Sequence, residues 1–142
     1  MPDYIKGQQT GGDVPEQTPV ITTVVVDTVT LVHAPAAATK ATVTVAAGAV
    51  RHVCSGITAS IGCGITAQTP ININLIDGVS GGATLLWSGV AAAAVNNACW
   101  YELTGLSIHG SLNTAMTLEF AAAGVAASVE AVVLHYYDEF EK

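Results

Sequence analysis

Thr69-Pro70-Ile71-Asn72-Ile73-Asn74-Leu75-Ile76-Asp77-Gly78 is the stretch that decides the fold of this chain. Aliphatic and polar residues alternate along it, with Ile71, Ile73 and Leu75 in one set and Asn72 and Asn74 in the other. A period of two predicts a half-buried β-strand with the aliphatic set inward and the asparagines outward. Pro70 lacks an N–H group, so we expect it at the start of the strand. Asp77-Gly78 supplies the turn that ends it.

Segments of similar character recur along the chain, rich in β-branched residues or alternating in polarity. They cover residues 21–32, 42–45, 50–63, 84–90, 98–109, 116–120 and 129–138. The first is expected as one long strand or as two with a bend near Asp27, and the fifth is kinked or divided at Gly105. Residues 84–90 are expected to pair with the opening strand. About eight short strands with regularly spaced turns predict an all-β protein, an antiparallel sandwich or barrel.

Two segments also fit a helix. Residues 91–94 are four alanines, which favour a helix by propensity. Four residues are too few to nucleate one. Residues 121–131 have helical spacing through Val125, Val129 and Val132, whereas Gly124 and the β-branched run after it favour a loop followed by a strand.

The first nineteen residues differ from all that follow. They are polar and glycine-rich, contain Pro15 and Pro19, and carry Tyr4 and Ile5 as their sizeable apolar residues. This composition predicts an extended N-terminal arm at residues 1–19 and a β-sandwich domain at residues 20–142. A passive tail is the alternative to an arm that orders on a partner.

The overall composition indicates that part of the surface is buried against other chains. Hydrophobic residues make up 51% of the chain and charged residues 11%, against about 25% charged residues in a typical soluble domain. The longest apolar run, at residues 83–95, is interrupted and shorter than the roughly 20 residues of a membrane-spanning helix. We therefore expect no membrane contact and a homo-oligomer or larger assembly.

Charge excludes one class of partner. The chain has eleven acidic and four basic residues, which gives a net charge of −7. Four scattered cations, Lys6, Lys40, Arg51 and Lys142, form no basic patch, so nucleic-acid binding is not expected. The start Met1-Pro2-Asp3 has neither the basic nor the apolar region of a signal peptide, which predicts a cytoplasmic origin.

The three cysteines, Cys54, Cys63 and Cys99, lack the paired spacing of a zinc site and are expected as small buried hydrophobic residues. A Cys54–Cys63 disulfide is the alternative. On one unbroken strand their offset of nine residues places them on opposite faces, whereas a bulge or turn at Gly56 would bring them to one face.

No catalytic or cofactor-binding pattern occurs, so we expect no enzyme, cofactor or metal. His33, His52, His109 and His135 have no Cys or carboxylate at ligand spacing and are expected at edges or interfaces. Asp138, Glu139 and Glu141 are expected to form a solvated tail.

Asp77 is one carboxylate, too few for calcium. Trp87, Trp100 and Tyr101 are expected in a core or interface, with a sugar-stacking platform as the alternative.

Two longer stretches carry a family resemblance. Residues 66–78 with the following Leu86-Trp87-Ser88-Gly89, and residues 103–120 (LTGLSIHGSLNTAMTLEF), resemble small virion proteins of tailed bacteriophages. The likeness covers residues 50–138 and ends near Tyr137-Asp138. It implies a jelly-roll-like capsid decoration (cement) protein, usually trimeric, which binds the major capsid protein on the virion surface.

Two functions therefore remain. The first is a structural cement protein that reinforces a capsid, and the second is a head-fibre or tail-tip module that binds a receptor glycan. The scarcity of charge favours the first. The arm is expected to carry the capsid contact, with five residues as the predicted binding residues: Tyr4, Ile5, Gln8, Gln9 and Val14.

Overall fold

The computed structural model describes residues 20–32, 40–125 and 128–140, and for residues 20–32 it describes the backbone alone. These ranges contain eight strands: β1 (Val20–Val32), β2 (Thr42–Val45), β3 (Arg51–Gly62), β4 (Gln68–Asp77), β5 (Leu85–Ala93), β6 (Ala98–Leu112), β7 (Met116–Phe120) and β8 (Val129–Phe140). Nowhere in them is there a helix long and apolar enough to cross a membrane.

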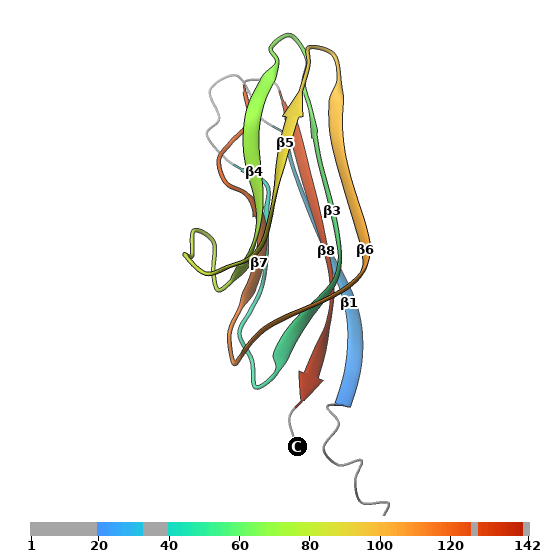
Figure 1. Ribbon diagram of the computed structural model, residues 1–142, viewed down its shortest axis with the longest axis vertical. Coiled ribbons are helices and arrows are strands. Elements are labelled where there is room, and N and C mark those ends of the chain that lie inside the picture. Colours follow the sequence, from blue (N-terminus) through green and yellow to red (C-terminus); the bar gives the residue numbers. More distant parts are fainter. Residues whose placement is uncertain (1–19, 33–39, 126–127, 141–142) are drawn as a thin grey trace, which may run out of the picture.

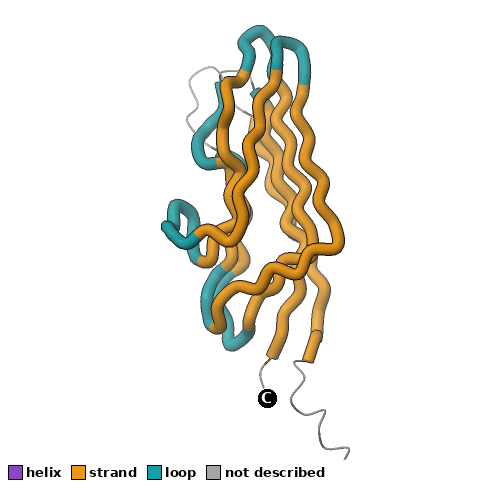
Figure 2. Tube along the Cα trace, in the orientation of Figure 1, coloured by secondary structure: helices purple, strands orange, loops and turns teal. Residues whose placement is uncertain are grey.

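The strands form two four-stranded antiparallel sheets that face each other (Figures 1 and 2). One sheet has the order β1-β8-β3-β6 and the other the order β2-β7-β4-β5. Each sheet therefore mixes strands from the beginning and the end of the chain, which is the arrangement of an eight-stranded jelly roll. The predicted antiparallel sandwich of about eight strands, and its jelly-roll character, are confirmed.

Strand β4 has the faces that its alternation predicts. Ile73 and Leu75 are fully buried between the sheets and Ile71 is nearly so, whereas Asn72 is exposed. Pro70 is the third residue of β4 rather than the first. It lies where the pairing with β5 shifts register, between Gln68 and Ile71, and such an irregularity accommodates a residue that cannot donate a ladder hydrogen bond.

The core consists of the inward residues of both sheets, chiefly aliphatic. Its largest fully buried apolar side chains are Ile57, Ile61, Ile73, Leu75, Ile76, Met116, Leu118, Phe120 and Leu134. Burial alternates along β8 with a period of two, so each inward residue is flanked by residues on the outer face.

The ambiguous segments are strands or loops. β1 is continuous, and residues 91–93 prolong β5. Gly105 has a φ of 70° and kinks β6 without dividing it, a conformation that glycine adopts at low cost. Residues 121–125 contain no helix and β8 begins at Val129, so a loop followed by a strand is confirmed there, apart from residues 126–127 outside the described ranges.

The cysteines are free thiols. Cys54 and Cys63 are buried as predicted, whereas Cys99 is only partly buried. A register shift between Cys54 and Gly56 places both Cys54 and Cys63 in the core. A shared face does not allow a bridge, because nine residues along one strand span about 30 Å and a disulfide joins Cα atoms less than about 7 Å apart. Burial raises the pKa of the Cys54 thiol to about 11, despite a hydrogen bond to the Gly56 carbonyl.

We predict that Ile73→Ala lowers the free energy of unfolding by about 2–5 kcal/mol, because it leaves a cavity at the centre of the core. Denaturant titration followed by circular dichroism measures this. The neighbouring exposed residue provides the control, since Asn72→Ala should change stability by less than about 0.5 kcal/mol. Equal effects of the two substitutions would contradict the assignment of faces in β4.

Candidate interaction surface

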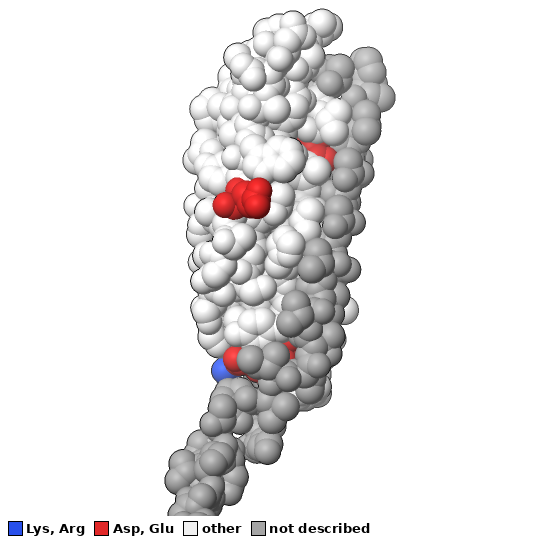
Figure 3. Space-filling view, turned by 90° about the vertical axis from the view of Figure 1, so that its right-hand side faces the viewer, with Lys and Arg blue, Asp and Glu red and all other residues white. Residues whose placement is uncertain are grey.

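Around Ser60 and Trp100, the outer face of the β8-β3-β6 part of the first sheet is almost free of charge, whereas Arg51, His109 and Glu139 lie toward its other end. Its side chains alternate with core residues on the same strands and are Thr58, Ser60, Gly62, Ala98, Trp100, Glu102, Thr104, Val129, Ala131, Val133, His135 and Tyr137. We call these residues the neutral face. Figure 3 looks onto this side of the sandwich and shows a broad uncharged area around an isolated acidic patch.

Trp100 and Glu102 stand out on this face. Trp100 lies opposite Ser60 and Glu102 opposite Thr58. The Trp100 side chain is 66% exposed, because the residues beside it are small. A large exposed aromatic ring among small polar residues is a feature of binding surfaces rather than of a monomer's solvated surface.

Most other carboxylates have partners within the protein. Glu119 pairs with Lys40 at 2.8 Å, Asp138 with His52 at 2.6 Å and Glu139 with His109 at 3.4 Å. Asp77 accepts hydrogen bonds from the backbone N–H and the hydroxyl of Ser111, and Glu130 accepts one from the Ala41 N–H. Among the carboxylates whose side chains are described, Glu102 is the exposed one.

The free edges of the two sheets lie next to each other at β5 and β6, and the β5 edge is sealed by a side chain. The Tyr101 hydroxyl accepts a hydrogen bond from the Val90 N–H at 3.2 Å and donates one to the Val90 carbonyl. Tyr101 is held by an edge-to-face contact with Trp87, with ring centroids 6.1 Å apart. Gly89 makes room for this pair, since a Cβ there would lie 2.6 Å from the Trp87 ring.

The second sheet has a different outer surface, covered by the loop between β4 and β5 that projects on the left of Figure 1. Glu119 on β7 points outward yet is only 2% exposed, because it binds Lys40, the Ser80 hydroxyl and the Gly81 N–H. Burial raises the pKa of Glu119, but these hydrogen bonds outweigh burial and leave the pKa below its ordinary value. The cluster fastens the loop to the sheet.

The prediction that the histidines lie at edges or interfaces is wrong for His52. Its side chain is buried on β3, a central strand, with Nδ1 at 2.6 Å from Asp138 and Nε2 at 2.9 Å from the Ala46 carbonyl. His109 lies on the edge strand β6 and His135 on the outer face of β8. His33 lies outside the described residues.

The prediction of a solvated acidic tail is wrong for two of its three members. β8 continues to Phe140, and Asp138 and Glu139 lie within it, each paired with a histidine. The sequence conceals these pairs because strands distant in the chain bring them together. Glu141 falls outside the described ranges.

The aromatic residues do not form a common sugar-stacking platform. Trp87 and Tyr101 pack against the core, whereas Trp100 lies on the opposite face of β6. The expectation of core or interface packing therefore holds for Trp87 and Tyr101.

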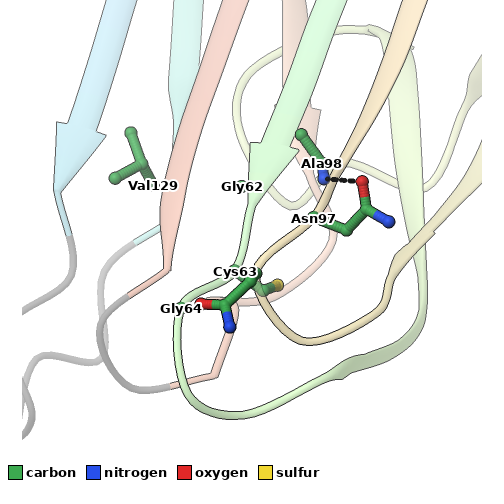
Figure 4. A pocket seen from close by; sticks show the side chains of 7 residues that line it. Gly62, Cys63, Gly64, Asn97, Ala98 and Val129 are labelled. Atoms are coloured by element: carbon green, nitrogen blue, oxygen red, sulfur yellow. Dashed lines mark hydrogen bonds between the residues drawn. The ribbon is translucent and has the colours of Figure 1, made fainter.

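A pocket of about 590 Å³ lies at the end of the sandwich where β3 ends and β6 begins (Figure 4). It is lined by small residues, with the Asn97 side chain turned to the Ala98 N–H at 3.2 Å. No acid–base pair lines it, and no group of three or more His, Cys, Asp or Glu suited to a metal occurs in the described part of the chain.

The five residues predicted to contact a capsid, Tyr4, Ile5, Gln8, Gln9 and Val14, lie outside the described residues, and that assignment stays a prediction. Sequence reasoning missed the neutral face, and the signal was present. Trp100, Glu102 and Thr104 are each two residues apart. This spacing places all three on one face of a strand.

Comparisons with known proteins add little. No family model matches the chain, and no curated protein matches it. Among solved structures, one similar chain comes from work titled "Bacillus endospore appendages form a novel family of disulfide-linked pili". It is 11% identical, the match covers 82% of this chain and 89% of that one, and the TM-score is 0.26. We base no argument on a likeness of this size.

We predict that Glu119→Gln lowers the free energy of unfolding by about 1–3 kcal/mol at pH 7, because a buried charged acceptor loses its ion pair and part of its hydrogen bonding. A lowered folded-state pKa means that the carboxylate stabilises the fold above its unfolded pKa, and that this contribution is lost as pH falls through the folded pKa. The difference in the free energy of unfolding between Glu119→Gln and the unchanged chain should therefore shrink as pH is lowered.

Urea titrations at neutral and acidic pH measure both effects. Asn72→Ala is the control, since an exposed residue outside the proposed contacts should contribute less than about 0.5 kcal/mol. If the free energies of unfolding of Glu119→Gln and the unchanged chain differed by the same amount at all pH values, the Glu119 carboxylate would not stabilise the fold through its charge.

Proposed function

We propose that this chain is a structural virion protein that binds the outside of a tailed-phage capsid and reinforces it. The observation that carries the proposal is the neutral face, a nearly uncharged sheet surface with exposed Trp100 on its edge strand β6. The resemblance of residues 50–138 to small phage virion proteins supports the setting.

A charge-poor surface suits attachment to a large protein surface. Binding to a protein removes water from both partners, and a surface with few charges loses little solvation free energy. Depletion of charge at the centre and an aromatic anchor are typical of protein–protein interfaces. Among the carboxylates whose side chains are described, Glu102 alone belongs to the neutral face, so repulsion from an acidic partner is weak there.

The glycan-binding alternative has less support. A sugar platform requires aromatic rings on one surface beside converging polar groups, and Trp87 and Tyr101 are turned away from Trp100.

We predict that Ser60→Lys, which adds a charge to the neutral face, abolishes saturable binding to capsids stripped of decoration protein. Trp100→Ala should weaken binding roughly tenfold or more, as expected for the loss of an anchor residue. Co-sedimentation with capsids of the encoding phage, quantified on gels over a concentration series, measures both effects.

Asn72→Lys is the matched control, because it adds the same charge to the exposed outer face of the other sheet. It should bind like the unchanged chain. Full binding by Ser60→Lys, with loss in Asn72→Lys, would place the contact on the opposite sheet. Absence of any binding by the unchanged chain would overturn the proposed function.

A further inference from the structure

Among the described residues, strand β6 pairs with β3 on one side and has no strand partner on the other, so its backbone there is available to another strand. Cys63 donates its N–H to the Asn97 carbonyl, and the paired positions continue as Ile61 with Cys99 and Ala59 with Tyr101. In an antiparallel ladder, hydrogen-bonded pairs alternate with non-hydrogen-bonded pairs. The N–H and C=O groups of Trp100, Glu102 and Thr104 therefore point away from β3, toward the free edge.

This edge lacks the protection that natural edge strands carry. Lysine, proline and short length are the usual devices, and β6 has no lysine or proline and is 15 residues long. The neighbouring β5 edge, by contrast, is sealed at Val90 by Tyr101. The Ser111 N–H of β6 is capped by Asp77, which leaves the stretch around Trp100, Glu102 and Thr104 open.

We propose that this stretch of β6 binds the N-terminal arm of a neighbouring copy of the chain as an added parallel strand. Residues 3–14 form a run of twelve without proline, between Pro2 and Pro15, so every residue in it has an N–H for a ladder. The arm ends where β1 begins, at Val20, which pairs with Phe140 at the same end of the sheet as Leu112 of β6.

Charge and alternation select the register. Lys6 is one of four cations in the chain, and Glu102 is the exposed carboxylate on the neutral face. Placing Lys6 beside Glu102 places Tyr4 beside Trp100 on the same face, because both pairs are two residues apart. Ile5 then points inward, toward partly buried Tyr101 and Leu103.

A neighbouring copy is favoured over the chain's own arm by composition. The chain is 51% hydrophobic and 11% charged, which indicates contact surfaces between copies. Exchange of arms from each copy to the next gives a head-to-tail interface that closes into a ring, and three copies would make the predicted trimer. The arm would lie along the β6 edge of the neutral face and would share Trp100 with the proposed capsid contact. The inference assigns the arm itself to the oligomer instead of the capsid.

Cross-linking tests the register and the source of the arm. We expect Lys6→Cys combined with Glu102→Cys, in a Cys99→Ser background, to give covalent oligomers on mild oxidation. Each single cysteine variant in the same background is the control and should give no oligomer ladder. A cross-linked product with the mass of one chain would show that the chain's own arm occupies the edge and would overturn the exchange. No cross-link would overturn the register.

A proline substitution tests the edge itself. Glu102→Pro removes an outward N–H without removing a bond to β3, and we expect sedimentation to change from the mass of three chains to that of one. Ser88→Pro is the matched control, because Ser88 has the same outward orientation as Val90 on the sealed edge, and its oligomer should persist. Unchanged circular dichroism confirms that both variants are folded.

Deletion of residues 2–14 separates this inference from the capsid contact predicted for the arm. Dissociation of the oligomer to single chains supports arm exchange. An intact oligomer that no longer binds capsids would overturn it and support the capsid contact instead. An intact oligomer with undiminished capsid binding would overturn both assignments of the arm.

Discussion

Burial of one face of each sheet against the other is the constraint on which the rest of this structure depends. The inward residues are mostly aliphatic and of moderate size, with Phe120 as the largest buried side chain. A core of this kind gains its stability from apolar area removed from water on both sheets together. Neither sheet would be stable alone, so the long crossings that place β8 beside β1 and β3 are as necessary as any single contact.

Polar residues are placed so that the sandwich buries few unpaired charges. The buried acids each meet a donor from a distant segment, as Glu119 meets Lys40 and Gly81. These pairs join the loops and ends to the sheets, and Glu130 does so from an inward, fully buried position on β8. Because the acids are used internally, the outer face of β8, β3 and β6 has little charge, and its character follows from the internal pairing as much as from its own residues.

The local features of the fold could be predicted from sequence, and the long-range ones could not. Alternation on β4 and β7 fixed which residues face the core, since a strand has only two faces. The pairing of His52 with Asp138 could not be predicted, because the two residues are far apart in the chain and meet only through the pairing of β3 with β8. Glu119 illustrates the same limit: its outward position follows from alternation, whereas its burial depends on a loop that folds back over it.

The three free thiols have a consequence for where such a protein can remain folded. No covalent cross-link contributes to the described sandwich, so its stability does not depend on the redox potential of its surroundings. Thiolate formation at Cys54 is suppressed by burial, and thiolate is the form that oxidants attack. The described sandwich therefore forms without an oxidation step, and a reducing compartment does not weaken it.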